Sequence, residues 1–99
     1  MIARMTVTVW QPELVDQLEQ AAIQAAQQVG PMLKGSAGFK GGYWMADRTT
    51  GRFIGLTFWE TEENAQAYEA ATAQLRAQVS QGQPQQAIEH FEVYDSILP

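Results

Sequence analysis

Residues 38–68 read GFKGGYWMADRTTGRFIGLTFWETEENAQAY, and this stretch decides the fold. It predicts two aromatic-rich strands over 39–47 and 52–60. They are joined by a turn ending at Gly51, which can adopt a positive φ. Thr61 then suits the start of a helix, because its hydroxyl can accept a hydrogen bond from a free backbone N–H. The stretch therefore predicts a strand, a turn, a second strand and the beginning of a helix.

The flanking sequence adds a strand and a helix before this stretch and a strand after it. Residues 4–10 alternate as a strand does. Pro12 opens a helix with apolar residues at helical spacing, and the Gly-Pro pair at 30–31 is expected to end it. The second helix is expected to end within 80–84, and the last strand covers 89–95. The predicted order is β-α-β-β-α-β.

That order is the ferredoxin-like plan, an α+β fold with a four-stranded antiparallel sheet and both helices on one face. The length of 99 residues predicts a single domain over 1–99. A solvated sheet face should alternate to polar residues, but here both faces carry large apolar side chains. We therefore expect a homodimer through sheet-to-sheet packing. The opposed residues are Met5 and Val7 against Trp10, Tyr43 and Met45 against Trp44, and Leu56 and Phe58 against Trp59.

Composition excludes several classes of function. The net charge is −5, and the six basic residues are scattered, so no basic face exists for nucleic acid or for an anionic membrane surface. No run approaches the 18 or so apolar residues of a membrane-spanning helix. Cysteine is absent, which excludes disulfides and thiolate chemistry. The first residues lack the long apolar stretch of a signal peptide, so a cytoplasmic location is expected.

The middle of the chain resembles the dimeric α/β-barrel superfamily, and more narrowly the antibiotic-biosynthesis-monooxygenase-like (ABM) domain. The resemblance implies homodimers with a barrel between the subunits and a pocket between sheet and helices. Some members are cofactor-independent monooxygenases of polycyclic aromatic phenols, others degrade haem, and others are isomerases or decarboxylases. The matching pieces are Gly38-Phe39, the 47–51 turn, Leu56-Thr-Phe-Trp59-Glu, Thr61-Glu-Glu-Asn-Ala65 and Tyr68.

The residues of haem-degrading members are mostly missing. The resemblance implies an Asn on the first strand, a Trp early in the second helix and a His about ten residues later. This chain has Thr6 and Thr8 on the strand, Tyr68 in the helix and Gln78 near the His position. We therefore expect no haem degradation.

Trp59, Tyr68 and His90 are the candidate substrate-binding residues, and no residue is assigned as catalytic. Trp59 either lines a cavity or packs in the core, and core packing is the simpler interpretation of Tyr68. His90, the only histidine, is either a general base near neutral pH or a strand residue at the sheet edge or dimer seam. One histidine without cysteine does not predict a metal site, and no cofactor is expected.

Two functions remain open from the sequence. The first is a cofactor-independent monooxygenase that takes an aromatic or quinol-like small molecule. The second is a non-catalytic protein that binds a hydrophobic ligand or has a structural role. A pocket lined by Trp59 and Tyr68 with a polar group inside would favour an enzyme or a ligand binder.

Overall fold

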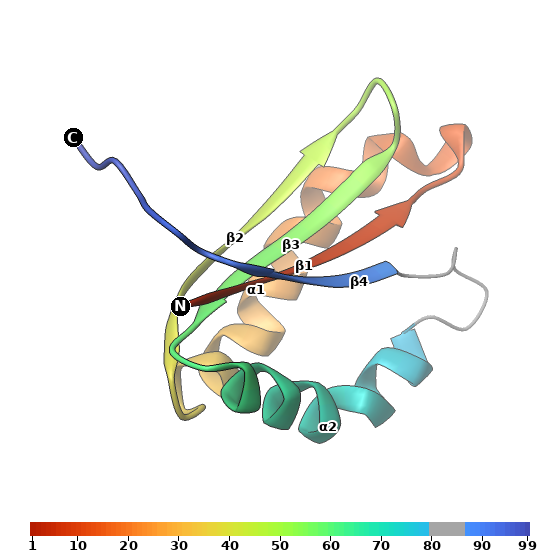
Figure 1. Cartoon of the computed structure of the whole chain (residues 1–99). Coiled ribbons are helices and arrows are strands. Elements are labelled where there is room, and N and C mark those ends of the chain that lie inside the picture. The colour runs from red at the N-terminus through yellow and green to blue at the C-terminus, as the bar shows by residue number, and fades with distance from the viewer. Residues whose placement is uncertain (80–86) are drawn as a thin grey trace.

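The computed structural model describes residues 1–79 and 87–99, except for the side chains of 75–79. Figure 1 shows a sheet with two helices packed against it. The elements in chain order are β1 (Ile2–Val9), a 3-10 segment η1 (Pro12–Gln17), α1 (Leu18–Lys34), β2 (Phe39–Asp47), β3 (Arg52–Trp59), α2 (Glu62–Val79) and β4 (Ala87–Glu92).

The four strands form one antiparallel sheet in the order β2-β3-β1-β4. Strand β1 is therefore flanked on both sides, and Arg4 in its middle pairs with Thr57 of β3 and His90 of β4.

At the β2–β3 turn Gly51 has a φ of 74°. A Cβ at this position would lie 2.6 Å from the backbone oxygen of Trp10. The predicted α+β, ferredoxin-like βαββαβ arrangement is confirmed.

The core lies between the helices and one face of the sheet. Trp59 is fully buried, and it packs with Leu33 of α1 and Ala65 of α2. Trp44 packs against the same cluster. These contacts show that the face of the sheet that carries Trp44 and Trp59 is the face that meets the helices.

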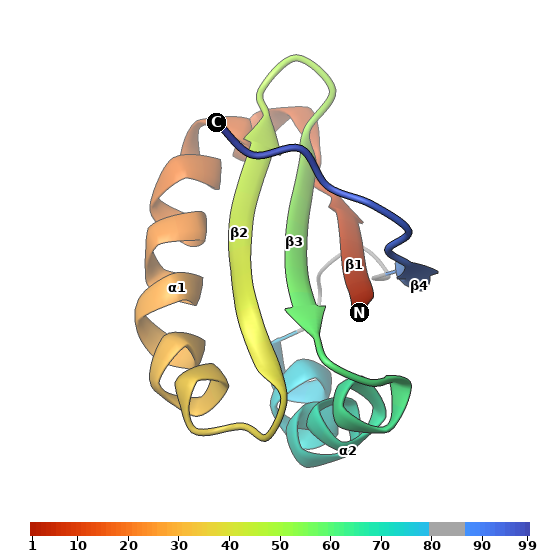
Figure 2. The same cartoon turned by 60° about the vertical axis from the view of Figure 1, so that its left-hand side comes forward.

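The opposite face, which we call the open face, has no helix over it. Strand alternation from Trp59 places Phe58, Leu56 and Ile54 on this face. Tyr43, which pairs in register with Leu56, is 62% exposed, and Phe91, which pairs with Ala3 on the same face, is 47% exposed. In Figure 2 the C-terminal tail beyond β4 crosses in front of β3 and β2, while α1 lies on the other side of the sheet.

The first helix differs from the sequence prediction at both ends. It begins as the 3-10 segment η1, and the α-helix starts only at Leu18. It also continues past Pro31 to Lys34, so the prediction that the Gly-Pro pair ends it is wrong. Gly30 has no Cβ to clash with the proline ring, which leaves the helical conformation open to it. The extra turn places Leu33 in the core, where it is almost fully buried.

The last strand is shorter than predicted. It spans Ala87–Glu92 rather than 89–95, because Glu92 pairs with Ile2 and β1 has no residue in the ladder beyond that point. One further backbone bond joins Val93 N–H to the carbonyl oxygen of Met1 at 2.9 Å. The predicted end of the second helix at 80–84 lies outside the described residues. Over the part of the chain that is described, no helix is both long and apolar enough to cross a membrane.

Candidate functional site

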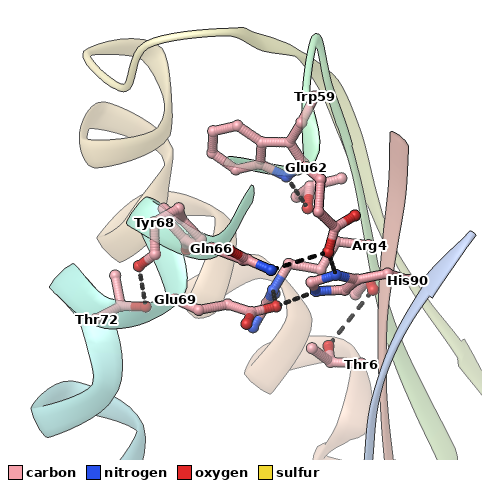
Figure 3. A network of polar contacts seen from close by, with 11 residues as sticks. Arg4, Thr6, Trp59, Glu62, Gln66, Tyr68, Glu69, Thr72 and His90 are labelled. Carbon is pink, nitrogen blue, oxygen red and sulfur yellow. Dashed lines mark hydrogen bonds and ion pairs between the residues drawn. The ribbon is translucent and has the colours of Figure 1, made fainter. Parts of the chain in front are cut away.

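A polar network lies between α2 and the edge of the sheet formed by β1 and β4 (Figure 3). Arg4 donates from Nε to Oε1 of Glu69 at 2.8 Å. His90 donates from Nε2 to the same oxygen of Glu69 and from Nδ1 to Oε1 of Glu62. Two residues of the sheet and two of the helix therefore form one connected cluster. We call Arg4, Glu62, Glu69 and His90 the ionic cluster.

The position of the ionic cluster follows from local structure. Arg4 and His90 are direct partners in the β1–β4 ladder, so their side chains leave the same face of the sheet. Glu62 and Glu69 are seven residues apart, or about two helical turns, so they lie on the same side of α2. Each carboxylate can then meet the imidazole from a different direction.

The arrangement around His90 favours the cationic form of its imidazole. Carboxylates only accept hydrogen bonds, so both ring nitrogens must carry a proton. The hydrogen bond to Glu69 raises the pKa of His90 above its ordinary value, burial opposes this, and the bond to Glu62 adds to the rise. A ring with both nitrogens engaged cannot accept a proton. In this geometry His90 is a charge-stabilising group and not a general base.

Glu69 is the central acceptor of the ionic cluster. Burial pushes the pKa of its carboxyl upward, but hydrogen bonds from His90 and Arg4 and their positive charges outweigh it. The pKa therefore lies below its ordinary value. Because one oxygen of Glu69 serves both Arg4 and His90, loss of this carboxylate would leave two cations without a shared partner.

Arg4 is the most buried member of the ionic cluster, with 5% of its surface exposed. Its Nη2 is buried and has no hydrogen-bond partner among the described residues. The guanidinium carbon lies 5.4 Å from the centre of the Tyr68 ring, within the range of a cation–π contact. Arg4 thus links the ionic cluster to the aromatic side chains beneath α2.

Three aromatic rings continue from Arg4 into the core. The Tyr68 ring centre lies 5.1 Å from that of Trp59, and Phe39 meets Trp59 edge-on at 5.5 Å. The indole N–H of Trp59 donates to Oγ1 of Thr57 at 2.9 Å, which satisfies its only polar group. Trp59 is therefore a core residue whose ring supports Tyr68 from below, and Tyr68 lies half-buried between Trp59 and Arg4.

The structure brings the three predicted site residues into one region. Trp59 touches Tyr68, and Tyr68 reaches His90 through Arg4 and Glu69. Sequence reasoning missed Arg4, Glu62 and Glu69. By sequence alone Arg4 is one of several scattered basic residues, and Glu62 is a charge that favours a helix start. One signal was available, since an arginine within an alternating apolar strand requires a buried partner.

The ionic cluster does not form a metal site. Within the part of the chain that the structure describes, no group of three or more His, Asp or Glu side chains is arranged to hold a metal ion. Both imidazole nitrogens of His90 already donate to carboxylates, and a protonated nitrogen cannot coordinate a cation.

Solved structures with the same fold include two oxygenases and a haem degrader. A monooxygenase from the gene ActVA-Orf6 of Streptomyces coelicolor, in complex with nanaomycin D, is 16% identical with a TM-score of 0.74. The alignment covers 99% of this chain and 91% of that one. The haem degrader MhuD of Mycobacterium tuberculosis, with two haems bound, is 20% identical with a TM-score of 0.70. There the alignment covers 98% and 99% of the two chains.

The third is SnoaB, a cofactor-independent oxygenase from Streptomyces nogalater. It is 9% identical with a TM-score of 0.66, and the alignment covers 97% of this chain and 95% of SnoaB. No protein-family model matches the sequence, and no curated protein matches it significantly. The chain thus has the fold of ABM-like proteins, and the resemblance predicted from the sequence is confirmed at the level of the fold.

Proposed function

We propose that this protein is a cofactor-independent monooxygenase that acts on an aromatic or quinol-like small molecule between α2 and the sheet. The observation that carries this proposal is the position of Tyr68, which contacts the Trp59 ring on one side and the Arg4 guanidinium on the other. An aromatic surface and a buried cation therefore meet at one point. The fold is shared with a monooxygenase and with a cofactor-independent oxygenase, which supports the reaction class.

The proposed reaction requires few functional groups from the protein. An anthrone-like ring methylene reacts with dioxygen to give a ring carbonyl and one molecule of water, so atoms and electrons balance without a further reductant. The electron-rich form of such a substrate is its anion, and cations in a site of low dielectric constant lower the free energy of that anion. Arg4 and the protonated His90 can supply this stabilisation.

The roles of the candidate residues follow from their positions. Tyr68 provides a ring face next to Arg4 together with a hydroxyl, and it is the candidate for direct contact with the substrate. Trp59 holds Tyr68 in place from within the core. His90 acts through Glu69 on the charge of Arg4. No residue is assigned as the proton acceptor, because both imidazole nitrogens of His90 are engaged by carboxylates.

The working unit that we propose is a homodimer with the two open faces packed together. The open face carries large apolar side chains from all four strands, and exposure of many such side chains to water is disfavoured. Packing two such sheets would bury it and complete a barrel between the subunits. The exposed large hydrophobic residues of this face include Val9, Tyr43, Met45 and Phe91. A cytoplasmic location stays a prediction.

Oxygen uptake with a panel of anthrone-like and quinol compounds tests the proposed reaction. We expect uptake with at least one aromatic compound and formation of the corresponding quinone. Tyr68→Phe should lower kcat/KM by about tenfold if the hydroxyl contacts the substrate. Arg48→Gln, at an exposed ion pair with Glu19, is the control and should keep the wild-type rate. Absence of turnover across the panel would leave the second hypothesis, a non-catalytic protein that binds a hydrophobic ligand.

A further inference from the structure

One nitrogen of the Arg4 guanidinium is the least explained polar atom of the described structure. Nη2 is buried and unpartnered, while Nε of the same side chain donates to Glu69. Buried polar groups almost always have a hydrogen-bond partner, and leaving a charged donor unpaired is especially costly. A donor of this kind leaves a position open for an acceptor that arrives from outside the chain.

We propose that Nη2 of Arg4 binds a negatively charged oxygen of the ligand, so that the protein prefers an aromatic phenolate or carboxylate to a neutral compound of the same shape. The aromatic part of this ligand rests on the proposed function, because it depends on the surface formed by Tyr68. The charge preference rests on Arg4 itself. Arginine stays protonated at every physiological pH, and its planar fork suits oxyanions.

The arrangement around Arg4 leaves part of its charge available. Its partner Glu69 shares a single oxygen between Arg4 and His90, so one carboxylate serves two cations. Glu62 provides the second negative charge, but it contacts only His90 within the ionic cluster. The two positive and two negative charges of the ionic cluster sum to zero, and the unpartnered donor belongs to the Arg4 guanidinium. An incoming anion thus meets a positive group without meeting a net negative site.

His90 and Glu69 are the positioning residues for this oxyanion site. If His90 loses its proton, Arg4 is the one remaining cation of the ionic cluster, and the cluster becomes negative by one charge. Both changes weaken the binding of an anion. Among the described side chains, the charged groups that face His90 are Glu62 and Glu69 from α2 and Arg4 from β1, and Glu92 lies two residues on along the same face of β4. Anion binding is therefore expected to depend on the protonation of His90.

The position of Tyr68 limits the shape of the ligand. Its ring lies next to the guanidinium, so an oxyanion bound at Nη2 would bring the attached aromatic ring close to Tyr68. Apolar contact with Tyr68 and pairing with Arg4 would then act on one small molecule. Since Nη2 is covered, a ligand reaches it only when side chains between α2 and the sheet move apart.

Binding of two matched probes tests the inference without any oxygen chemistry. The probes are 2-naphthoate and 2-naphthamide, which share a ring system and differ in charge, and binding is followed by tryptophan fluorescence. We expect 2-naphthoate to bind at least about tenfold more tightly. Arg4→Gln should abolish this preference, and Arg48→Gln, which makes the same change of net charge at an exposed position, should keep it. Equal binding of the two probes by the wild-type protein would overturn the proposal.

A second variant tests the inference independently, in case Arg4→Gln does not fold. His90→Gln leaves Arg4 in place, and circular dichroism establishes whether each variant is folded. In the wild type the preference for 2-naphthoate should fall as the pH rises through the raised pKa of His90. His90→Gln should show a weaker preference that no longer changes with pH over that range. A variant that loses affinity for both probes equally would assign His90 a structural role only and would contradict the proposal.

Two further results separate this inference from the proposed function. A nitronaphthol, whose phenolate absorbs visible light, shows whether a phenolate also binds through Arg4. Binding of either anion through Arg4 supports the oxyanion site, whether or not any compound is oxidised. If an anion binds in this way and no compound is oxidised, only the oxygenase proposal fails. Oxygen uptake that Arg4→Gln leaves unchanged would support the reaction and overturn the oxyanion site.

Discussion

Arg4 and His90 are direct partners across the β1–β4 ladder, and both side chains donate to the same oxygen of Glu69. A single carboxylate on α2 therefore joins two neighbouring strands to the helix. Near its N-terminal end α2 is also held by Ala65, which is fully buried in the core. The ionic cluster supplies a second attachment between α2 and the sheet.

Removing the carboxylate of Glu69 should destabilise the fold. Glu69→Ala leaves Arg4, which is 5% exposed, without its partner at Nε. We expect a loss of about 2–3 kcal/mol, below the usual cost of breaking a fully buried pair because Glu69 is partly exposed. Urea denaturation measures the effect. Glu19→Ala, which breaks the exposed pair with Arg48, is the matched control and should cost less than about 0.5 kcal/mol. Equal losses would contradict the role assigned to the ionic cluster.

Protonation of His90 should make stability depend on pH in a defined direction. Its pKa is raised in the folded protein, so the stabilisation is fully present below the ordinary value of 6.5 and declines as the pH rises through the folded pKa. For Glu69 the pKa is lowered, so its contribution is present above 4.5 and is lost as the pH falls through the folded pKa. Stability should therefore be greatest between about pH 4.5 and 6.5.

Denaturation curves of His90→Gln at several pH values test the predicted loss of stabilisation by His90 as the pH rises. The variant should be less stable than the wild type near pH 6, and the difference should shrink as the pH rises toward 9. Glu13→Gln changes an exposed residue of η1 and should keep the wild-type profile. A difference that stays constant across this pH range would show that the charge of His90 does not contribute.

Two glycines should respond to alanine to different extents. Gly51 has a φ of 74°, and a Cβ there would lie 2.6 Å from the backbone oxygen of Trp10, so Gly51→Ala should cost about 1–3 kcal/mol. Gly30 lies inside α1, where alanine favours the helix, but it directly precedes Pro31, and a Cβ before proline disfavours the helical conformation. These two effects oppose each other, so Gly30→Ala should change the free energy of unfolding by less than about 1 kcal/mol. Thermal melts measure both variants.

The proposed dimer should be sensitive to charge on the open face. Leu56 pairs in register with Met5 on one side and Tyr43 on the other, which places it in the middle of that face. Leu56→Glu should convert the dimer to a monomer, since a buried unpaired carboxylate is strongly disfavoured. Gln24→Glu on the exposed side of α1 adds the same charge and should leave the dimer intact. Sedimentation velocity at micromolar concentration distinguishes the two species, and a monomeric wild type would refute the proposed interface.

The sequence predicted the element order because each segment carries its own local signal. Alternation marks the strands, Thr61 does accept a bond from the N–H of Asn64 at 3.1 Å at the start of α2, and Gly51 does take a positive φ. The end of α1 was predicted wrongly, because the local signal of Pro31 was outweighed by the burial of Leu33 in the core.

The sequence by itself determined an α+β, ferredoxin-like chain with apolar residues on both faces of its sheet. It could not determine which face meets the helices, because alternation fixes only that neighbours point in opposite directions. The tertiary structure decided this by burying Trp59 against Leu33 and Ala65. The tertiary structure also decided which residues form the candidate site. Arg4, Glu69 and His90 are separated by 21 residues or more along the chain, and only strand pairing and the placement of α2 bring their charges together.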